Sequence, residues 1–216
     1  MNENDKRQMI VDHCLEMNRT GLNQGTSGNI SLRHERGMLI SPSGVDYREM
    51  SADDIVFVDQ QGQPHGELNP SSEWRFHLAI LNRYDAFDAV VHSHPVHATA
   101  LAMCRQDIPA AHYMVAAAGG ETVPCARYET FGTDALSEAL LEALENRRAC
   151  LMANHGMVAC GATLGRAMWL AVEVETLARQ YVIARSIGTP HILDRQEMTR
   201  VIDKFKDYGR QPNRAT

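Results

Sequence analysis

The segment "ACLMANHGMVACG" (149–161) decides the fold expected for this chain. Apolar residues stand on both sides of the central "NHG", so the pattern predicts a strand, a tight turn and a second strand. Gly156 is expected to supply the conformational freedom that the turn requires. Short strands joined by tight turns favour an antiparallel or mixed sheet over a doubly wound parallel one.

Further elements are predicted on both sides of this hairpin. Runs of apolar and β-branched residues between turn signals predict strands at 30–34, 37–41, 54–59, 88–94 and 121–127. Apolar steps of three and four residues predict helices at 6–20, 69–84, 96–103, 133–147, 163–187 and 194–206. Ser71 or Ser72 is expected to cap the second of these helices, and Pro95 to open the third.

Composition limits the class of protein. The chain has 216 residues, 44% of them hydrophobic, which suits one α/β domain over 1–216 and is too little for two. The net charge of −6 argues against a nucleic-acid-binding surface. No apolar run is long enough to span a bilayer or to act as a signal segment. The five cysteines are odd in number and form no C-x-x-C pair, which favours reduced thiols in the cytoplasm.

A group of histidines follows the strand at 88–94, in "VVHSHPVHA" (90–98). Alternate side chains of a strand share a face, so His92 and His94 point the same way and can reach one zinc-type ion. His97 falls on the following helix and is not expected to be a ligand. Two ordinary half-buried histidines would give the same pattern, so this motif alone leaves the choice open.

Two further residues strengthen the metal hypothesis. A buried apolar hairpin has no structural need for His155 at its tip, and Glu73 lies in the first turn of a predicted helix. The helix dipole alone would favour a carboxylate there. Three histidines and one carboxylate are nevertheless a plausible set of ligands for a catalytic zinc ion.

Three segments rich in glycine, serine and asparagine could present donors to an anion: "GTSGN" (25–29), "SPSG" (41–44) and "PSS" (70–72). None is a nucleotide-binding motif, and all three are also ordinary turn sequences. A helix N-terminus after Ser71 and Ser72 would suit a phosphate. An anion held there would lie close to Glu73.

Taken together, the motifs "GLNQGTSGNIS", "GMLISPSG", "PSSEWRFH", "AVVHSHPVHATA", "IPAAHYMVAAAGG", "ARYETFGT" and "NHGMVACG" resemble the class II aldolase/adducin family. The resemblance runs in order from about residue 6 to "KFKDYG" at 204–209. It implies a central, mainly antiparallel sheet flanked by helices. It also implies a homotetramer with active sites at subunit interfaces.

The resemblance assigns roles to individual positions. It implies one Zn²⁺ per subunit held by His92, His94, His155 and Glu73, with Glu73 also acting as acid/base. The phosphate-binding positions that it implies are Asn29, Ser43, Gly44, Ser71 and Ser72. Tyr113 matches a catalytic tyrosine lent by a neighbouring subunit, Phe131 an aromatic of the aldehyde pocket, and Tyr208 a tyrosine of a mobile C-terminal tail from about 207.

The function implied is reversible cleavage of a ketose 1-phosphate, best matched by L-fuculose 1-phosphate, to dihydroxyacetone phosphate and L-lactaldehyde. A Schiff-base mechanism fits less well, because Lys6, Lys204 and Lys206 all stand near the chain ends, away from the site motifs. The metal instead suits the negative charge that develops on the donor.

Other functions stay open within and beyond this family. An aldolase for a related deoxy-ketose phosphate is one, and a ribulose-phosphate 4-epimerase is another, although such epimerases have Asp where this chain has Glu73. An adducin-like interaction module, the non-enzymatic alternative, would bind no metal. His77 could support the site, but a histidine on a helix face more often simply packs; Cys150 and Cys160 are expected to be core thiols.

Overall fold

Residues 149–161 form the predicted hairpin. In the computed structural model, which describes residues 2–205, β7 (Ala149–Met152) and β8 (Gly156–Gly161) pair antiparallel, with Ala149 opposite Ala159. β8 pairs antiparallel with β5 (Ala89–Ser93), and β5 with β1 (Asn29–His34). The hairpin thus lies next to β5, the strand on which the histidine motif begins.

The described residues build one eight-stranded sheet in the order β4-β3-β2-β1-β5-β8-β7-β6. The other strands are β2 (Gly37–Ile40), β3 (Val56–Asp59), β4 (Pro64–His65) and β6 (Cys125–Ala126). Every neighbouring pair is antiparallel except β6 and β7, which run parallel. The expected mainly antiparallel sheet is confirmed.

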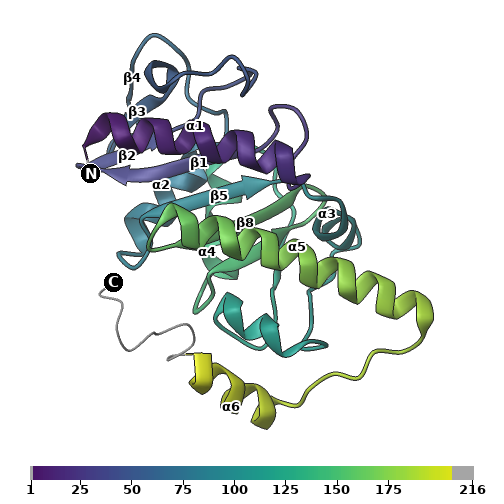
Figure 1. The fold of residues 1–216 in the computed structure, drawn as a ribbon. Helices are drawn as coiled ribbons and strands as arrows, with labels where there is room; N and C mark the ends of the chain where they lie inside the picture. The colour runs from purple at the N-terminus through teal and green to yellow at the C-terminus, as the bar shows by residue number, and fades with distance from the viewer. Residues whose placement is uncertain (1, 206–216) are drawn as a thin grey trace, which may run out of the picture.

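Helices cover both faces of this sheet (Figure 1). α1 (Glu3–Thr20), α3 (Val96–Met103) and α5 (Leu164–Ile187) pack on one face, and α2 (Trp74–Arg83) and α4 (Asp134–Ala143) on the other. Two short 3₁₀ helices, η1 (Ala52–Asp54) and η2 (Tyr113–Ala118), lie in connections, and α6 (Arg195–Phe205) packs beside η2. The fold is therefore three layers deep, helices–sheet–helices.

Alternation along β5 decides which layer each side chain meets. Val91 belongs to the apolar core under α1 and α5, whereas Val90 packs in the core under α2 and α4. His92 faces the α2 side as well, because its ring lies 5.5 Å from the ring of Phe76 on that helix. A two-residue period thus turns the first histidine of the motif toward the start of α2.

The structure corrects three local predictions. α2 begins at Trp74 with Glu73 in the N-cap position, so neither Ser71 nor Ser72 caps it. The strand predicted at 121–127 shortens to two residues, because Pro124 has no N–H to donate to a ladder. α3 covers the predicted range Val96–Met103, but Pro95 precedes it as the N-cap residue with an extended backbone and does not lie in its first turn.

Candidate metal centre

Three imidazole rings meet at the end of β5. Their possible ligand atoms, from His92, His94 and His155, all lie within 4.8 Å of one another, and the three ring centroids are 4.8–4.9 Å apart. The Nε2 atoms of His92 and His94 are only 2.9 Å apart. The predicted alternation therefore does place these two rings on one face, with the hairpin tip bringing the third.

The carboxylate of Glu73 faces the same space. Its Oε2 atom lies 3.1 Å from Nε2 of His92, and its Oε1 atom lies 3.2 Å from Nε2 of His155. The residue is only 5% exposed, and its carboxylate makes no capping bond to α2, since it is turned toward the histidines. Oε1 is buried and has no hydrogen-bond partner in the described part of the chain.

A backbone contact fixes the orientation of His92. Its Nδ1 atom lies 2.9 Å from the carbonyl oxygen of Met157, which can only accept, so Nδ1 carries the proton of the neutral ring. Nε2 is then left with a lone pair aimed at the other ligand atoms. This arrangement is typical of metal-binding histidines, whose second nitrogen donates to a carbonyl or carboxylate.

The protonation states suit a cation. Burial of His94, helped by the neighbouring His92 and His155, lowers its pKa to about 4, so its ring is neutral at pH 7. Burial alone would raise the pKa of the Glu73 carboxyl. The neighbouring imidazoles of His92 and His155 outweigh burial and hold that pKa well below its usual range. At neutral pH the site thus offers the ionised carboxylate of Glu73 and the neutral ring of His94.

This donor set fits a zinc-type ion. Three imidazole nitrogens and one carboxylate are ligands that zinc prefers, and buried Oε1 of Glu73 has a lone pair without a donor. Packing nitrogens and a carboxylate this closely in a buried position is unfavourable unless a cation compensates them.

The hairpin tip owes its geometry to two residues. Asn154, not Gly156, adopts the left-handed conformation there, with φ of 56°. The prediction that Gly156 supplies the unusual backbone is therefore wrong. Gly156 is needed for space instead, because a Cβ at this position would lie 2.6 Å from Cδ2 of His94 and 2.6 Å from the carbonyl oxygen of Ser93.

Two of the three loops predicted to bind an anion lie side by side, next to Glu73. Segments 41–44 and 69–72 form an antiparallel bridge, in which the N–H of Ser43 donates to the carbonyl of Asn69 at 3.0 Å. Ser71 is buried, and its hydroxyl oxygen accepts a 3.3 Å hydrogen bond from the N–H of Glu73. The loops are therefore fixed to the residue that faces the histidines.

Ser72, Gly44 and Phe131 are at the surface of this region. Ser72 and Gly44 are exposed, and Gly44 has φ of 72°, which favours glycine. A Cβ on Gly132 would lie 3.0 Å from the carbonyl oxygen of Ser72, so the turn that carries Phe131 touches the same loop. Phe131 itself is 63% exposed.

Tyr113 is not brought to this site within one chain. It begins η2, which packs on α5 and α6, and it stacks on His112 with ring centroids 4.9 Å apart while remaining 49% exposed. Its predicted role in a neighbouring subunit stays a prediction. Tyr208 lies outside the described residues.

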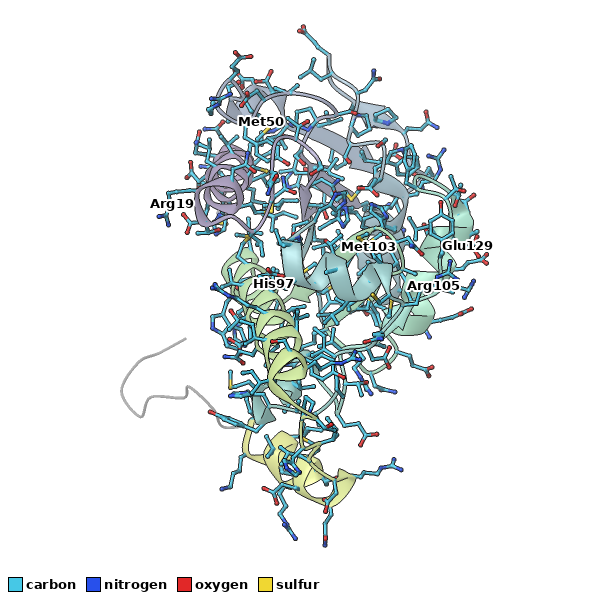
Figure 2. All side chains as sticks on the ribbon, turned by 90° about the vertical axis from the view of Figure 1, so that its right-hand side faces the viewer. Arg19, Met50, His97, Met103, Arg105 and Glu129 are labelled. Atoms are coloured by element: carbon cyan, nitrogen blue, oxygen red, sulfur yellow. The ribbon has the colours of Figure 1, made fainter. Side chains whose placement is uncertain are left out.

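The remaining histidine of the motif is accounted for elsewhere. His97 lies on α3 beside α5 (Figure 2), where its Nδ1 atom is 2.7 Å from Oε1 of Glu175. The expectation that it is not a ligand fits this position. Cys150 and Cys160 are buried free thiols whose pKa burial raises, as expected of core residues.

The hydrogen bonds that connect Glu73 to its buried neighbours were not predicted from the sequence. Asn29, predicted to bind phosphate, donates from Nδ2 to Oε2 of Glu73 at 3.0 Å, and its Oδ1 lies 2.6 Å from Nε2 of His77. His77 is fully buried and also contacts the hydroxyl of Ser31 at 2.8 Å. The four-residue spacing of Glu73 and His77 was the only sequence signal for this network.

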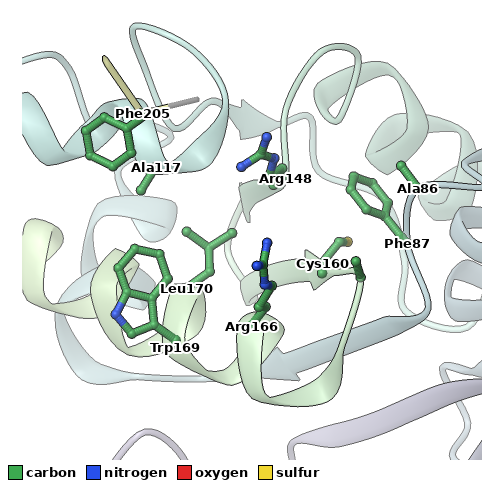
Figure 3. Close-up of a pocket in the computed structure, with 11 residues that line it drawn as sticks. Ala86, Phe87, Ala117, Arg148, Cys160, Arg166, Trp169, Leu170 and Phe205 are labelled. Carbon is green, nitrogen blue, oxygen red and sulfur yellow. The ribbon is translucent and has the colours of Figure 1, made fainter. Parts of the chain in front are cut away.

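A hollow of about 410 Å³ lies elsewhere, between α5, α6 and the ends of β7 and β8 (Figure 3). Arg148 and Arg166 both line it, together with Phe87, Trp169 and Phe205. Two guanidinium groups repel a metal cation. This hollow is therefore no alternative metal site.

Comparison with known proteins agrees with the geometry. Residues 8–182 match the family described as the class II aldolase and adducin N-terminal domain. L-fuculose phosphate aldolase of Escherichia coli K12 is 49% identical over 210 residues, covering 97% of this chain and 98% of that protein. The 5-methylthioribulose-1-phosphate/5-deoxyribulose-1-phosphate aldolase of Rhodospirillum rubrum is 49% identical over 203 residues, covering 94% and 92%. A solved L-fuculose 1-phosphate aldolase superimposes with a TM-score of 0.91 at 40% identity, covering 94% of this chain and 96% of that one.

The chain belongs to the class II aldolase and adducin family. Its matches to aldolases run over nearly its whole length and include both the fold and the sequence, so it is an aldehyde-lyase of this family. Among residues 2–205, no helix combines the length and apolar character needed to cross a membrane.

Proposed function

We propose that this chain is a zinc-dependent aldolase that reversibly cleaves L-fuculose 1-phosphate to dihydroxyacetone phosphate and L-lactaldehyde. The observation that carries the proposal is the meeting of three imidazoles with a buried carboxylate beside a pair of serine-rich loops. The relatives named L-fuculose phosphate aldolase, 49% identical over nearly the whole chain, support the substrate.

His92, His94 and His155 would hold the metal through nitrogen, together with Glu73. When bound, a zinc ion acts as a Lewis acid that stabilises negative charge developing on the donor half of the substrate. The backbone carbonyl of Met157 keeps the His92 ring in its ligand tautomer.

The phosphate group would lie at the loops 41–44 and 69–72. The exposed hydroxyls of Ser43 and Ser72 and the open backbone at Gly44 are suited to an anion, while Ser71 ties the second loop to Glu73. Binding of the phosphate here orients the carbon chain toward the histidines. Asn29 is also proposed to contribute, although its side-chain amide is already bonded to Glu73.

Two residues would move protons. Glu73 would take or return the proton on the donor carbon, and Tyr113 of a neighbouring subunit would serve the hydroxyl of the aldehyde half. Phe131 would offer an apolar surface to the methyl end of L-lactaldehyde, and Tyr208 would close over it. These roles require that a second subunit complete the site, and we propose a homotetramer of single-domain subunits in the cytoplasm.

The test combines metal analysis with a retro-aldol assay. Purified protein is expected to contain about one zinc per chain and to release dihydroxyacetone phosphate from L-fuculose 1-phosphate. Protein that binds no divalent metal, or that releases no dihydroxyacetone phosphate from any ketose 1-phosphate, would refute the proposal. An epimerised ketose phosphate without cleavage would point to the epimerase alternative.

A second substrate deserves a direct comparison, because the Rhodospirillum rubrum relative at 49% identity is named for methylthioribulose and deoxyribulose phosphates. Both substrate types share the phosphorylated donor half and differ in the aldehyde. The ratio of kcat/KM for L-fuculose 1-phosphate to that for 5-deoxyribulose 1-phosphate decides between them. A ratio below one would favour the second function.

A further inference from the structure

A chain of hydrogen-bonded, buried polar side chains ends at Glu73. Ser31 Oγ lies 2.8 Å from Nδ1 of His77, and Nε2 of His77 lies 2.6 Å from Oδ1 of Asn29. Asn29 Nδ2 then donates to Oε2 of Glu73 at 3.0 Å. All four side chains are buried, and they come from β1, α2 and the residue before α2.

Only one assignment of donors and acceptors satisfies all the hydrogen bonds in this chain of side chains. A carboxylate only accepts, so the amide nitrogen of Asn29 must face Glu73 and its oxygen must face His77. That oxygen also only accepts, so His77 must donate from Nε2. Nδ1 of the neutral ring then holds a lone pair and accepts from the hydroxyl of Ser31. Each group donates to the next, and the chain of hydrogen bonds ends at the carboxylate.

This direction makes the two oxygens of Glu73 different. Oε2 accepts from Asn29 and also lies 3.1 Å from Nε2 of His92, whereas Oε1 lies 3.2 Å from Nε2 of His155 and has no hydrogen-bond donor among the described residues. If Asn29 turned its amide by half a rotation, its oxygen would face the carboxylate and its nitrogen would face the N–H of His77. Both contacts would be repulsive, so His77 locks the orientation that keeps Oε2 bound.

We propose that His77 is a positioning residue, which acts through Asn29 to anchor Oε2 of Glu73 and so holds the carboxylate facing the three histidines. The role rests on the proposed function, in which Glu73 is the acid/base. The anchor at Asn29 does not depend on the metal.

A simple packing role for His77 makes different predictions. Its ring stacks on Phe76 with centroids 4.5 Å apart, so an aromatic ring of similar size would preserve the packing. His77→Phe keeps the ring and removes the donor. His77→Gln keeps a donor and an acceptor on a side chain without the ring. Comparing His77→Phe with His77→Gln therefore separates the loss of hydrogen bonding from the loss of ring packing.

The chain offers a matched control. Ser93 is a fully buried serine on β5, like Ser31 on the neighbouring β1, but its hydroxyl has no hydrogen-bond partner in the described chain. Ser31→Ala removes the donor to His77, whereas Ser93→Ala removes a hydroxyl of equal burial. We expect the first to weaken the site and the second to leave it unchanged.

The experiment measures Zn²⁺ affinity by competition with a chelator, kcat and KM for L-fuculose 1-phosphate, and the ¹⁵N NMR shifts of the His77 ring in the metal-free wild-type protein. His77→Phe is expected to lower Zn²⁺ affinity and kcat by about 10-fold to 100-fold with little change in KM, and His77→Gln to recover part of the loss. The NMR shifts are expected to show a protonated Nε2 and an unprotonated Nδ1.

Wild-type Zn²⁺ affinity and kcat in His77→Phe would overturn the proposal, as would an Nδ1-protonated or doubly protonated ring. If His77→Phe fails to fold, the NMR measurement on the wild-type protein decides. The proposed function fails separately: a protein that cleaves no ketose phosphate would still show the tautomer and the loss of metal affinity.

Discussion

The Nε2 atom of His155 lies 3.2 Å from Oε1 of Glu73, yet this buried oxygen has no hydrogen-bond partner in the described part of the chain. An imidazole nitrogen and a carboxylate oxygen this close together are placed as two ligands of a common cation would be. A neutral amide cannot replace the carboxylate there, because it brings N–H groups toward the position of that cation.

Glu73→Gln is therefore expected to reduce Zn²⁺ affinity and to lower kcat for retro-aldol cleavage by about 10²-fold to 10⁴-fold, since it removes both a ligand and a proton acceptor. Chelator competition and initial rates measure the two effects. Glu175→Gln is the matched control, because Glu175 contacts His97 and caps α3 away from the site. It should lower stability without changing zinc content, and equal loss of zinc in both variants would contradict the prediction.

Gly156→Ala is expected to destabilise the metal-free protein by about 1–3 kcal/mol, because the new Cβ meets His94 and backbone at 2.6 Å. Urea unfolding gives the change in midpoint at constant slope. Gly165→Ala serves as the control: nothing lies within 4 Å of its Cβ, and it lies in α5, so alanine should stabilise by about 0.5–1 kcal/mol. An unchanged urea midpoint in Gly156→Ala would contradict the prediction, because it would show that the hairpin tip accommodates the Cβ without loss of stability.

Removal of the metal is expected to lower the melting temperature. An ion that binds only the folded state stabilises it by about 4 kcal/mol when its free concentration is about 1,000 times Kd. Calorimetric scans with zinc and with excess chelator measure the difference. The same scans on His92→Ala should show almost no difference, because the variant lacks a ligand at the centre of the site. A full zinc-induced shift in that variant would place the ion elsewhere.

Acid is expected to destabilise the metal-free protein through His77. Burial lowers the pKa of this histidine to about 3, whereas in the unfolded chain it is near 6.5. The unfolded state thus binds more protons between these values, so stability is full above pH 6.5 and falls as the pH falls toward 3. The contribution is at most about 1.4 kcal/mol per pH unit. Urea unfolding from pH 7 to pH 4 should show a smaller loss of unfolding free energy for His77→Phe than for wild type. The same pH dependence in both proteins would refute this prediction.

Much of the fold follows from local pattern. The hairpin at 149–161 is confirmed because two apolar runs flank the turn sequence NHG, and the long helix after Thr163 is confirmed with buried residues at steps of three and four. The parallel pairing of β6 with β7 could not be predicted, since two residues give no periodicity and the pairing depends on contacts distant in sequence.

The site was only partly predictable for a similar reason. Alternation along the predicted strand 88–94 aligns His92 and His94; in the structure β5 ends at Ser93, but the two rings still meet as expected. The contact of Asn29 with Glu73 depends on register between strands, because Asn29 lies directly opposite His92. No pattern near Asn29 carries that register, and its resemblance to a phosphate-binding position concealed the bond to Glu73.

The strand that carries His92 lies in the interior of the sheet, hydrogen-bonded to β1 on one side and to β8 on the other. Fraying begins at edge strands and loops, and it leaves such interior strands closed until the whole molecule opens. Backbone amides of β5 should therefore be among the slowest to exchange with solvent. The working lifetime of the enzyme at high temperature is then set by the rate of global unfolding, and stabilising any distant part of the core prolongs it.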